Sequence, residues 1–254
     1  MNHAKWIAYF NQNRRQRPEP DWSAPLSVPV KMFGPLLSSI EQFRLGDSGG
    51  PASLIACNAK GFCDQTTEMR AVVDLWFAEE AEHARLLGCA VRRFGGRVIN
   101  SHWSFTAFCW CRRLLGVRFE LQVLLLTELV STAYYRVLRA RSPDVPLAAM
   151  CGLILRDEAG HVAFHRDRLA DARRHLQGMR DAAWRIQFWV LGHAAAAMLW
   201  VNHGPCLKAI GGSRAEYFDE VRQQLGRFLR SLHRLCRSTA NRVYPGVPGV
   251  QVAG

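Results

Sequence analysis

Two Glu-x-x-His motifs, Glu80…His83 and Glu158…His161, are the residues of this chain best suited to chemistry. On an α-helix, residues three apart share a face, with Cβ atoms roughly 5–6 Å apart, so each motif presents a carboxylate and an imidazole together. These ligand types suit iron and manganese ions. Two such helices facing each other, with one more carboxylate from each of two other helices, can hold two metal ions. The sequence must then supply two further carboxylates.

The first further carboxylate is Glu128, which lies in the apolar segment Leu-Leu-Leu-Thr-Glu-Leu-Val. A buried carboxylate is costly unless it meets a proton, a cation or a metal. Glu120 is the competing candidate, but its neighbours Arg118 and Gln122 indicate a surface position for it. The pattern therefore favours Glu128.

The second further carboxylate is Asp47, which is in helical phase with Leu36, Ile40 and Phe43. Glu41 lies off that line. The predicted metal ligands are therefore Asp47, Glu80, His83, Glu128, Glu158 and His161.

The elements that must position these ligands are helices. From Val30 on, apolar residues recur with helical periodicity and strand signals are almost absent, so the predicted fold class is all-α. Residues 1–28 lack sustained periodicity and are expected to form an extended arm, and residues 241–254 a disordered tail. We expect residues 29–240 to form one helical domain. The first four predicted helices cover 31–47 (continuing past a kink towards 60), from 64–67 to 94, 105–140 and 146–175. The fifth covers 180–203, where Gly204-Pro205 stops it, and the sixth begins at a capping box, Ser213-x-x-Glu216.

Composition limits the function classes. The net charge of +12 fits either a solvated basic surface or a docking face for an acidic partner such as an electron carrier. No zinc-finger spacing, RNA-binding aromatic motif or P-loop accompanies this charge, so nucleic acid is not an expected partner. None of the eight cysteines forms a Cys-x-x-Cys pair, which indicates buried free thiols in a reducing cytosol. The most apolar stretch, residues 188–201, is too short for a membrane span, so we expect a cytoplasmic protein.

The motifs resemble signatures of the ferritin-like di-iron carboxylate superfamily, in its oxygen-activating branch. Residues 78–83 (Ala-Glu-Glu-Ala-Glu-His) and 156–161 (Arg-Asp-Glu-Ala-Gly-His) look like the EExxH and DExxH motifs of acyl-carrier-protein desaturases, ribonucleotide reductase small subunits, bacterial multicomponent monooxygenases and arylamine N-oxygenases. The resemblance spans about residues 35–170. It implies a ferritin-like four-helix bundle with two additional C-terminal helices, and a cofactor of two Fe ions or a Mn/Fe pair.

The same resemblance implies roles for residues around the ligands. Asp157 would hold His83, and Glu79 would hold His161, each from behind the metal. Thr132, one turn after Glu128, would supply a catalytic hydroxyl, with Ser131 as the near alternative. Further candidates near the site are His165, as a residue supporting a ligand or the core, and Tyr135, as a redox-active or a core tyrosine.

Asp47 departs from the family pattern, because most relatives have Glu there. Asp is one methylene shorter, which leaves three interpretations: it binds through a helix shift or a water, one metal is held more weakly, or the site has decayed.

The resemblance implies a metal-dependent oxidoreductase that activates O2 to hydroxylate, desaturate or N-oxygenate a small organic or carrier-bound substrate. An external electron donor is expected, because the chain has no flavin-binding or rubredoxin-like Cys-x-x-Cys segment. A homodimer is compatible with the sequence. Two alternatives stay open, namely a ferritin-like iron-binding or ferroxidase protein and a metal-poor helical scaffold.

Overall fold

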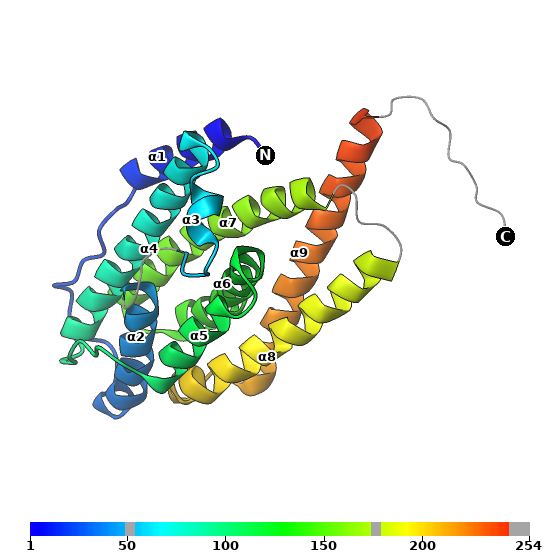
Figure 1. The fold of residues 1–254 in the computed structure, drawn as a ribbon. Coiled ribbons are helices and arrows are strands. Elements are labelled where there is room, and N and C mark those ends of the chain that lie inside the picture. Colours follow the sequence, from blue (N-terminus) through cyan, green and yellow to red (C-terminus); the bar gives the residue numbers. More distant parts are fainter. Residues whose placement is uncertain (49–53, 174–178, 244–254) are drawn as a thin grey trace.

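The fold is known from a computed structural model, which describes residues 1–48, 54–173 and 179–243. Within these ranges every regular element is a helix, as predicted (Figure 1). The elements are α1 His3–Arg15, the 3-10 turn η1 Val30–Met32, α2 Phe33–Ser48, α3 Ala59–Cys63, α4 Thr67–Arg93, α5 Trp103–Arg113, α6 Val117–Arg141, α7 Val145–Ala172, α8 Met179–Ala209 and α9 Arg214–Val243.

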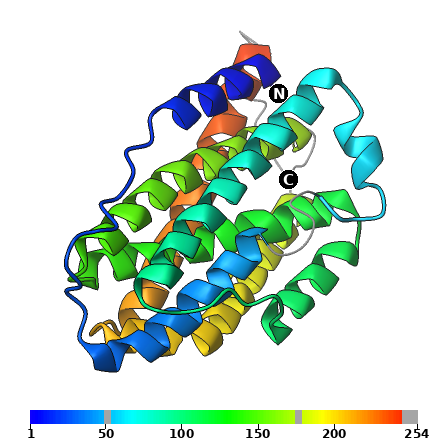
Figure 2. The same cartoon turned by 90° about the vertical axis from the view of Figure 1, so that its left-hand side faces the viewer.

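Four of these helices carry the predicted ligands. α2 packs along α4, α6 packs along α7, and α4 contacts α7, so the four helices enclose one core (Figure 2). Only residues 142–144 separate α6 from α7, which makes them antiparallel neighbours as expected. The helix ends also follow local signals, because Thr66 caps α4 and Asp144 caps α7, each accepting a hydrogen bond from a backbone N–H of the first turn.

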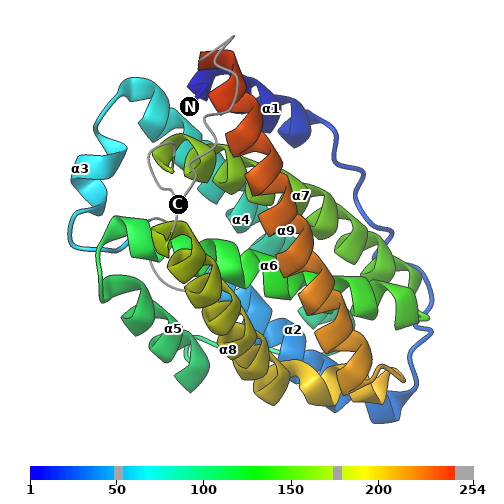
Figure 3. The same ribbon diagram turned by 90° about the vertical axis from the view of Figure 1, so that its right-hand side faces the viewer.

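α6 is the central helix of the molecule. It contacts α5, α7, α8 and α9, and Figure 3 shows it surrounded by these helices. Its second half is buried on nearly every side, which explains why the segment is apolar all round. α8 and α9, the two expected C-terminal helices, cover it from the side opposite α4.

The prediction of a single helix over 105–140 is wrong, because residues 114–116 divide it into α5 and α6. Gly116 adopts a φ of +82°, in the left-handed region that glycine enters without a steric penalty. The side chain of Asn58 then accepts a hydrogen bond of 2.7 Å from the backbone N–H of Val117 and starts α6. The apolar residues Leu114 and Leu115 continue the helical pattern in the sequence, yet both are exposed at this corner.

The predicted end of the fifth helix at Gly204-Pro205 is also wrong, because α8 continues to Ala209. Buried Cys206, Leu207 and Ile210 hold the last turn against the core, which outweighs the backbone hydrogen bond that proline removes. The next helix, α9, begins at the predicted capping box. Ser213 and Glu216 exchange hydrogen bonds between side chain and backbone there.

The predicted extended arm is wrong over residues 3–15, which form α1. Trp6, Phe10 and Asn13 are spaced like one face of a helix and are buried, and α1 packs on α4. Trp6 meets Phe164 of α7 edge to face, with ring centroids 5.7 Å apart. These three positions are the only buried ones in a polar segment, so its periodicity is weak in the sequence.

The rest of the arm, residues 16–29, is not helical and runs along the bundle to η1 (Figure 2). Arg93 of α4 fixes it by donating hydrogen bonds of 2.8 and 2.7 Å to the carbonyl oxygens of Trp22 and Ala24. Of the predicted disordered tail, residues 241–243 belong to α9, and residues 244–254 lie outside the described residues. Of the expected continuation of the first helix towards residue 60, residues 49–53 also lie outside them, and the prediction is wrong for residues 54–58, which are not helical.

All eight cysteines are free, but only Cys151 and Cys206 are buried, so the expectation of buried thiols holds in part. Among the described helices, none combines the length and apolar character needed to cross a membrane.

We expect Trp6→Ala to lower the free energy of unfolding by about 3–5 kcal/mol, because it removes a buried aromatic side chain. Exposed Ile186→Ala is the control and should cost below about 0.5 kcal/mol. Urea denaturation measures both. An unchanged midpoint, with α1 becoming sensitive to protease, would mean that α1 is not part of the cooperative unit.

Candidate metal centre

The structure brings the six predicted ligands together from α2, α4, α6 and α7. One ligand atom each from Asp47, Glu80 and His83 lies within 4.8 Å of the others, and the same holds for Glu80, Glu128 and His161. Glu80 is common to both groups. The arrangement therefore offers two neighbouring metal positions that share a carboxylate.

Two glutamates lie between the two imidazoles. The carboxylate of Glu80 places one oxygen 3.6 Å from His83 Nδ1 and the other 3.1 Å from His161 Nδ1. The carboxylate of Glu158 likewise lies 3.9 Å from His83 Nδ1 and 3.6 Å from His161 Nδ1. Glu80 and Glu158 are thus placed to bridge, with Asp47 at the His83 end and Glu128 at the His161 end.

Metal ions fit the polar atoms at this site. Among the described residues, the Nδ1 atoms of His83 and His161, both carboxylate oxygens of Glu128 and one oxygen of Glu158 are buried without a hydrogen-bond partner. Buried polar atoms in this state are costly, and several neighbouring carboxylates repel one another. Two divalent cations would balance the four carboxylates while the imidazoles stay neutral. Carboxylate and imidazole donors suit iron or manganese.

Acidic residues hold both histidines from behind. His161 Nε2 lies 3.0 Å from Glu79 Oε2, and His83 Nε2 lies 3.0 Å from Asp157 Oδ2. These are the pairs expected from the resemblance. A carboxylate accepts, so each Nε2 carries the proton and each Nδ1 presents its lone pair to the cluster.

α1 and the chain just after it contribute two residues that the sequence did not reveal as part of the site. Asn13 donates hydrogen bonds of 2.8 Å to Glu79 and 2.7 Å to Asp157, so one amide joins both supporting acids. Arg17 lies 2.6 Å from Asp157 and 3.5 Å from Glu79. The spacing of Trp6, Phe10, Asn13 and Arg17 at intervals of four, three and four residues was the available signal. It indicates one face of a helix, although α1 itself ends at Arg15, before Arg17.

Burial dominates the electrostatics of the metal-free cluster. It raises the pKa of Asp47, Glu128 and Glu158, and the neighbouring carboxylates add to the effect. Burial would also raise the pKa of Glu80, but the neighbouring imidazoles of His161 and His83 hold it below its usual range. For both histidines, burial opposes charging, yet their carboxylate partners raise the pKa. Protons therefore occupy the positions that metal ions would take.

The other candidate residues lie around the cluster. His165 is buried, with Nε2 at 3.4 Å from Glu128 Oε1, and burial lowers its pKa well below the usual value, which keeps it neutral. Tyr135 is buried beside Asp47 and lines a cavity next to the cluster. Thr132 is buried but is not among the residues lining that cavity, whereas Ser131, the alternative, is.

The expected surface position of Glu120 is wrong. Glu120 is fully buried, and its carboxylate lies 2.9 Å from Arg112 of α5. It also accepts hydrogen bonds from the backbone N–H groups of Ile55 and Ala56. Glu120 therefore anchors α5 and the segment before α3 to α6, and it is not part of the metal cluster.

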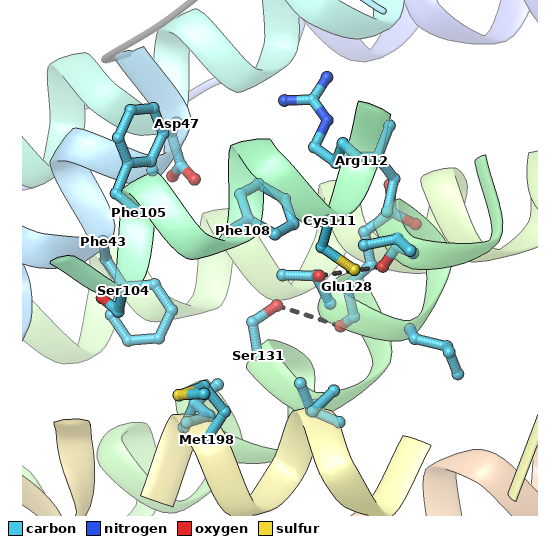
Figure 4. Close-up of a pocket in the computed structure, with 18 of the residues that line it drawn as sticks. Phe43, Asp47, Ser104, Phe105, Phe108, Cys111, Arg112, Glu128, Ser131 and Met198 are labelled. Atoms are coloured by element: carbon cyan, nitrogen blue, oxygen red, sulfur yellow. Dashed lines mark hydrogen bonds between the residues drawn. The ribbon is translucent and has the colours of Figure 1, made fainter. Parts of the chain in front are cut away.

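A cavity of about 420 Å³ adjoins the cluster on the side away from α1. All four carboxylate ligands line it, while His83 and His161 do not. Figure 4 shows Asp47 and Glu128 beside Phe105, Phe108 and Cys111 of α5. The cluster thus has a polar support behind the histidines and an apolar space in front of the carboxylates.

No protein-family model, curated protein or solved structure matches this chain. The described residues define a helical protein with a buried carboxylate and histidine cluster that could hold metal ions.

Metal loading should stabilise the protein more at about pH 8 than at about pH 5.5. In the metal-free protein the pKa values of Asp47, Glu128 and the histidines are raised, so their contribution to stability is fully present only at low pH and is lost as the pH rises through the folded pKa. Bound metal replaces these protons. Thermal unfolding with and without Fe(II), under nitrogen, measures the difference, and a metal effect that shrinks with rising pH would contradict this account.

Asn13→Ala should weaken metal binding by about 10–100-fold, because both supporting acids lose their shared donor. Asn11→Ala is the matched control, since Asn11 is exposed on the same helix and bonds only within it. Competition with a chelator measures the affinities. Equal affinities for both variants would show that Asn13 does not position the histidines.

Proposed function

We propose that this protein is a ferritin-like di-iron oxidoreductase that uses O2 to oxidise an organic substrate by hydroxylation, desaturation or N-oxygenation. The observation that carries this proposal is that the four clustered carboxylates form part of the wall of a largely apolar cavity of about 420 Å³. A volume of several hundred Å³ with apolar lining is typical of small-molecule sites. Iron storage alone has no use for such a space.

In this proposal Asp47 and His83 would help to hold one metal ion and Glu128 and His161 the other, and Glu80 and Glu158, which lie near both histidines, would contribute to both. The bound pair, Fe/Fe or Mn/Fe, supplies the electrons that reduce O2 and the oxidising power that acts on the substrate.

The residues of the chain then have separate tasks. Glu79, Asp157 and Asn13 fix the direction of both imidazoles through buried hydrogen bonds. An organic molecule that fills the cavity would lie next to Asp47 and Glu128 and would displace water from the carboxylate side. A preorganised, shielded site of this kind favours reaction with the bound substrate over side reactions.

The electron balance requires a partner. Hydroxylation or N-oxygenation consumes O2, two electrons and two protons, puts one oxygen atom into the substrate and releases one water. Desaturation with the same inputs releases two waters. The chain has no Cys-x-x-Cys pair or flavin-binding motif, so an external electron-carrier protein would deliver the two electrons.

Glu128→Ala should reduce metal content from about two ions to about one or none per chain, because it removes an end ligand. Glu82→Ala is the control, since Glu82 lies two residues from Glu80 on α4 but pairs with Arg85 outside the cluster. Metal analysis after anaerobic reconstitution with Fe(II) measures both. If the wild-type protein retains fewer than about one metal ion per chain, the proposal is wrong and the protein is a helical scaffold without a metal site.

Oxygen consumption separates the proposed function from ferroxidase activity. Fe(II)-loaded protein with a chemical reductant should consume O2 faster when an organic substrate is added. Rapid turnover of excess Fe(II) with growth of ferric mineral, and no response to organic compounds, would favour an iron-storage protein instead.

A further inference from the structure

We propose that the cavity selects a neutral, largely apolar organic molecule, which enters between α5 and α8, and that the buried Arg112–Glu120 pair excludes organic anions. This inference names the substrate class of the proposed oxidoreductase and rests on that proposed function.

The cavity walls are largely apolar. α5 supplies Phe105 and Phe108, α6 supplies Val123 and Leu124, and α8 supplies the small side chain of Ala195. Figure 4 shows the α5 side chains on one side and Met198 of α8 on another, with Ser131 of α6 between them. Such walls stabilise apolar surface by removing it from water.

The charge of the cavity excludes anions. Among the described lining residues, Arg112 is the one cationic side chain, and burial lowers the pKa of the lining His203 to about 3, so His203 is neutral. Arg112 is paired with Glu120 through contacts of 2.9 and 3.0 Å. Its guanidinium group points away from Glu128 and Phe108 in Figure 4. Two divalent metal ions and four carboxylates add to zero charge. A substrate carboxylate would therefore lose its water without gaining a counter-ion, which is costly.

A few polar side chains can still orient a neutral substrate. Gln42, Ser104 and Asn202 line the cavity and belong to three different helices, α2, α5 and α8. Each can donate or accept a hydrogen bond. A molecule with one neutral polar group, such as a carbonyl or an amine in its uncharged form, fits this lining.

The entrance lies where lining residues also meet solvent. Ala107 of α5 and Ala194 and Met198 of α8 line the cavity and are exposed. α5 and α8 run side by side over α6 in Figures 1 and 3. The surface beside this opening is apolar, with Trp103 and Val201 more than half exposed. An apolar rim of this kind admits apolar solutes more readily than ions.

Two probes of nearly equal shape test whether the cavity prefers neutral molecules to anions, which we call the charge rule. They are neutral 2-acetylnaphthalene and anionic 2-naphthoate. Calorimetric titration of the Fe(II)-loaded protein under nitrogen should show the ketone binding at least about tenfold more tightly than the carboxylate. Equal affinity, or preference for 2-naphthoate, would overturn the inference.

Ala195→Phe tests the location, because it fills the cavity from α8. It should weaken binding of 2-acetylnaphthalene by about tenfold or more while metal content stays unchanged. Ala197→Phe is the matched control, since Ala197 is exposed on the same helix and does not line the cavity. If both variants bind the ketone like the wild type, the assigned cavity is not the binding site.

Two further variants test the role of charge. Glu120→Gln leaves Arg112 with one anionic partner fewer, and Ala107→Lys adds a cation at the exposed entrance without touching the core. Each should raise the affinity for 2-naphthoate by about tenfold, the gain typical of one charge-assisted hydrogen bond. Circular dichroism and thermal unfolding establish that Glu120→Gln is folded, and Ala107→Lys decides the matter if it is not. No gain in Ala107→Lys would overturn the charge rule.

The outcomes separate this inference from the proposed function. If the protein binds two metal ions but binds neither of the two probes, the inference is contradicted while the proposed metal site stands. Protein that binds the ketone but no metal contradicts the oxidoreductase while the cavity assignment stands.

Discussion

The structure depends on one constraint, which is the enclosure of two buried imidazoles, two buried carboxylates (Glu128 and Glu158) and two partly buried ones (Asp47 and Glu80) in a helical core. Such a cluster is unstable unless protons or metal ions balance its charge. Glu80 of α4 and Glu158 of α7 each lie near both histidines. Without a balancing positive charge, the two carboxylates would repel each other and destabilise the packing of α4 on α7. The stability of the four-helix packing therefore depends on the same charge balance as the chemistry of the site. The helices concerned are α2, α4, α6 and α7. The apolar core around α6 supplies the burial that makes an unbalanced charge in the cluster costly.

The two sides of the cluster differ in kind, and this difference supports the proposed direction of the chemistry. On the histidine side, Asn13 joins Glu79 and Asp157 in a buried hydrogen-bonded group. α1 comes close enough to do this because Gly160 has no side chain where Tyr9 packs. On the carboxylate side, α5 and α8 enclose the apolar cavity. A hydrogen-bonded support behind the candidate metal ligands and an open space in front of them is the arrangement expected of the proposed site, which would oxidise a bound molecule.

Much of the site could be predicted because its signals are local. The Glu-x-x-His spacing fixes each carboxylate and imidazole on one helical face whatever the rest of the fold does. Glu128 was recognisable because its neighbours are apolar, and burial of a lone carboxylate demands a partner. Glu120 was misjudged by the same logic, since its polar sequence neighbours gave no sign that Arg112, from a different helix, would meet it in the core. Local composition predicts the burial of a residue well only where all its neighbours within one helical turn are apolar or all are polar.

The sequence by itself determined the all-α class, most helix limits, the capping box of α9 and the faces that carry the candidate ligands, because all of these depend on residues within one or two turns. The tertiary structure alone decided that residues 3–15 fold as α1, that α8 continues through Pro205 and that Asn13 reaches two acids from distant helices. It also decided which carboxylate oxygens face which imidazole and where the cavity lies. These features depend on contacts between residues far apart in the chain. Such contacts overrule weak local preferences, and no periodicity in the sequence records them.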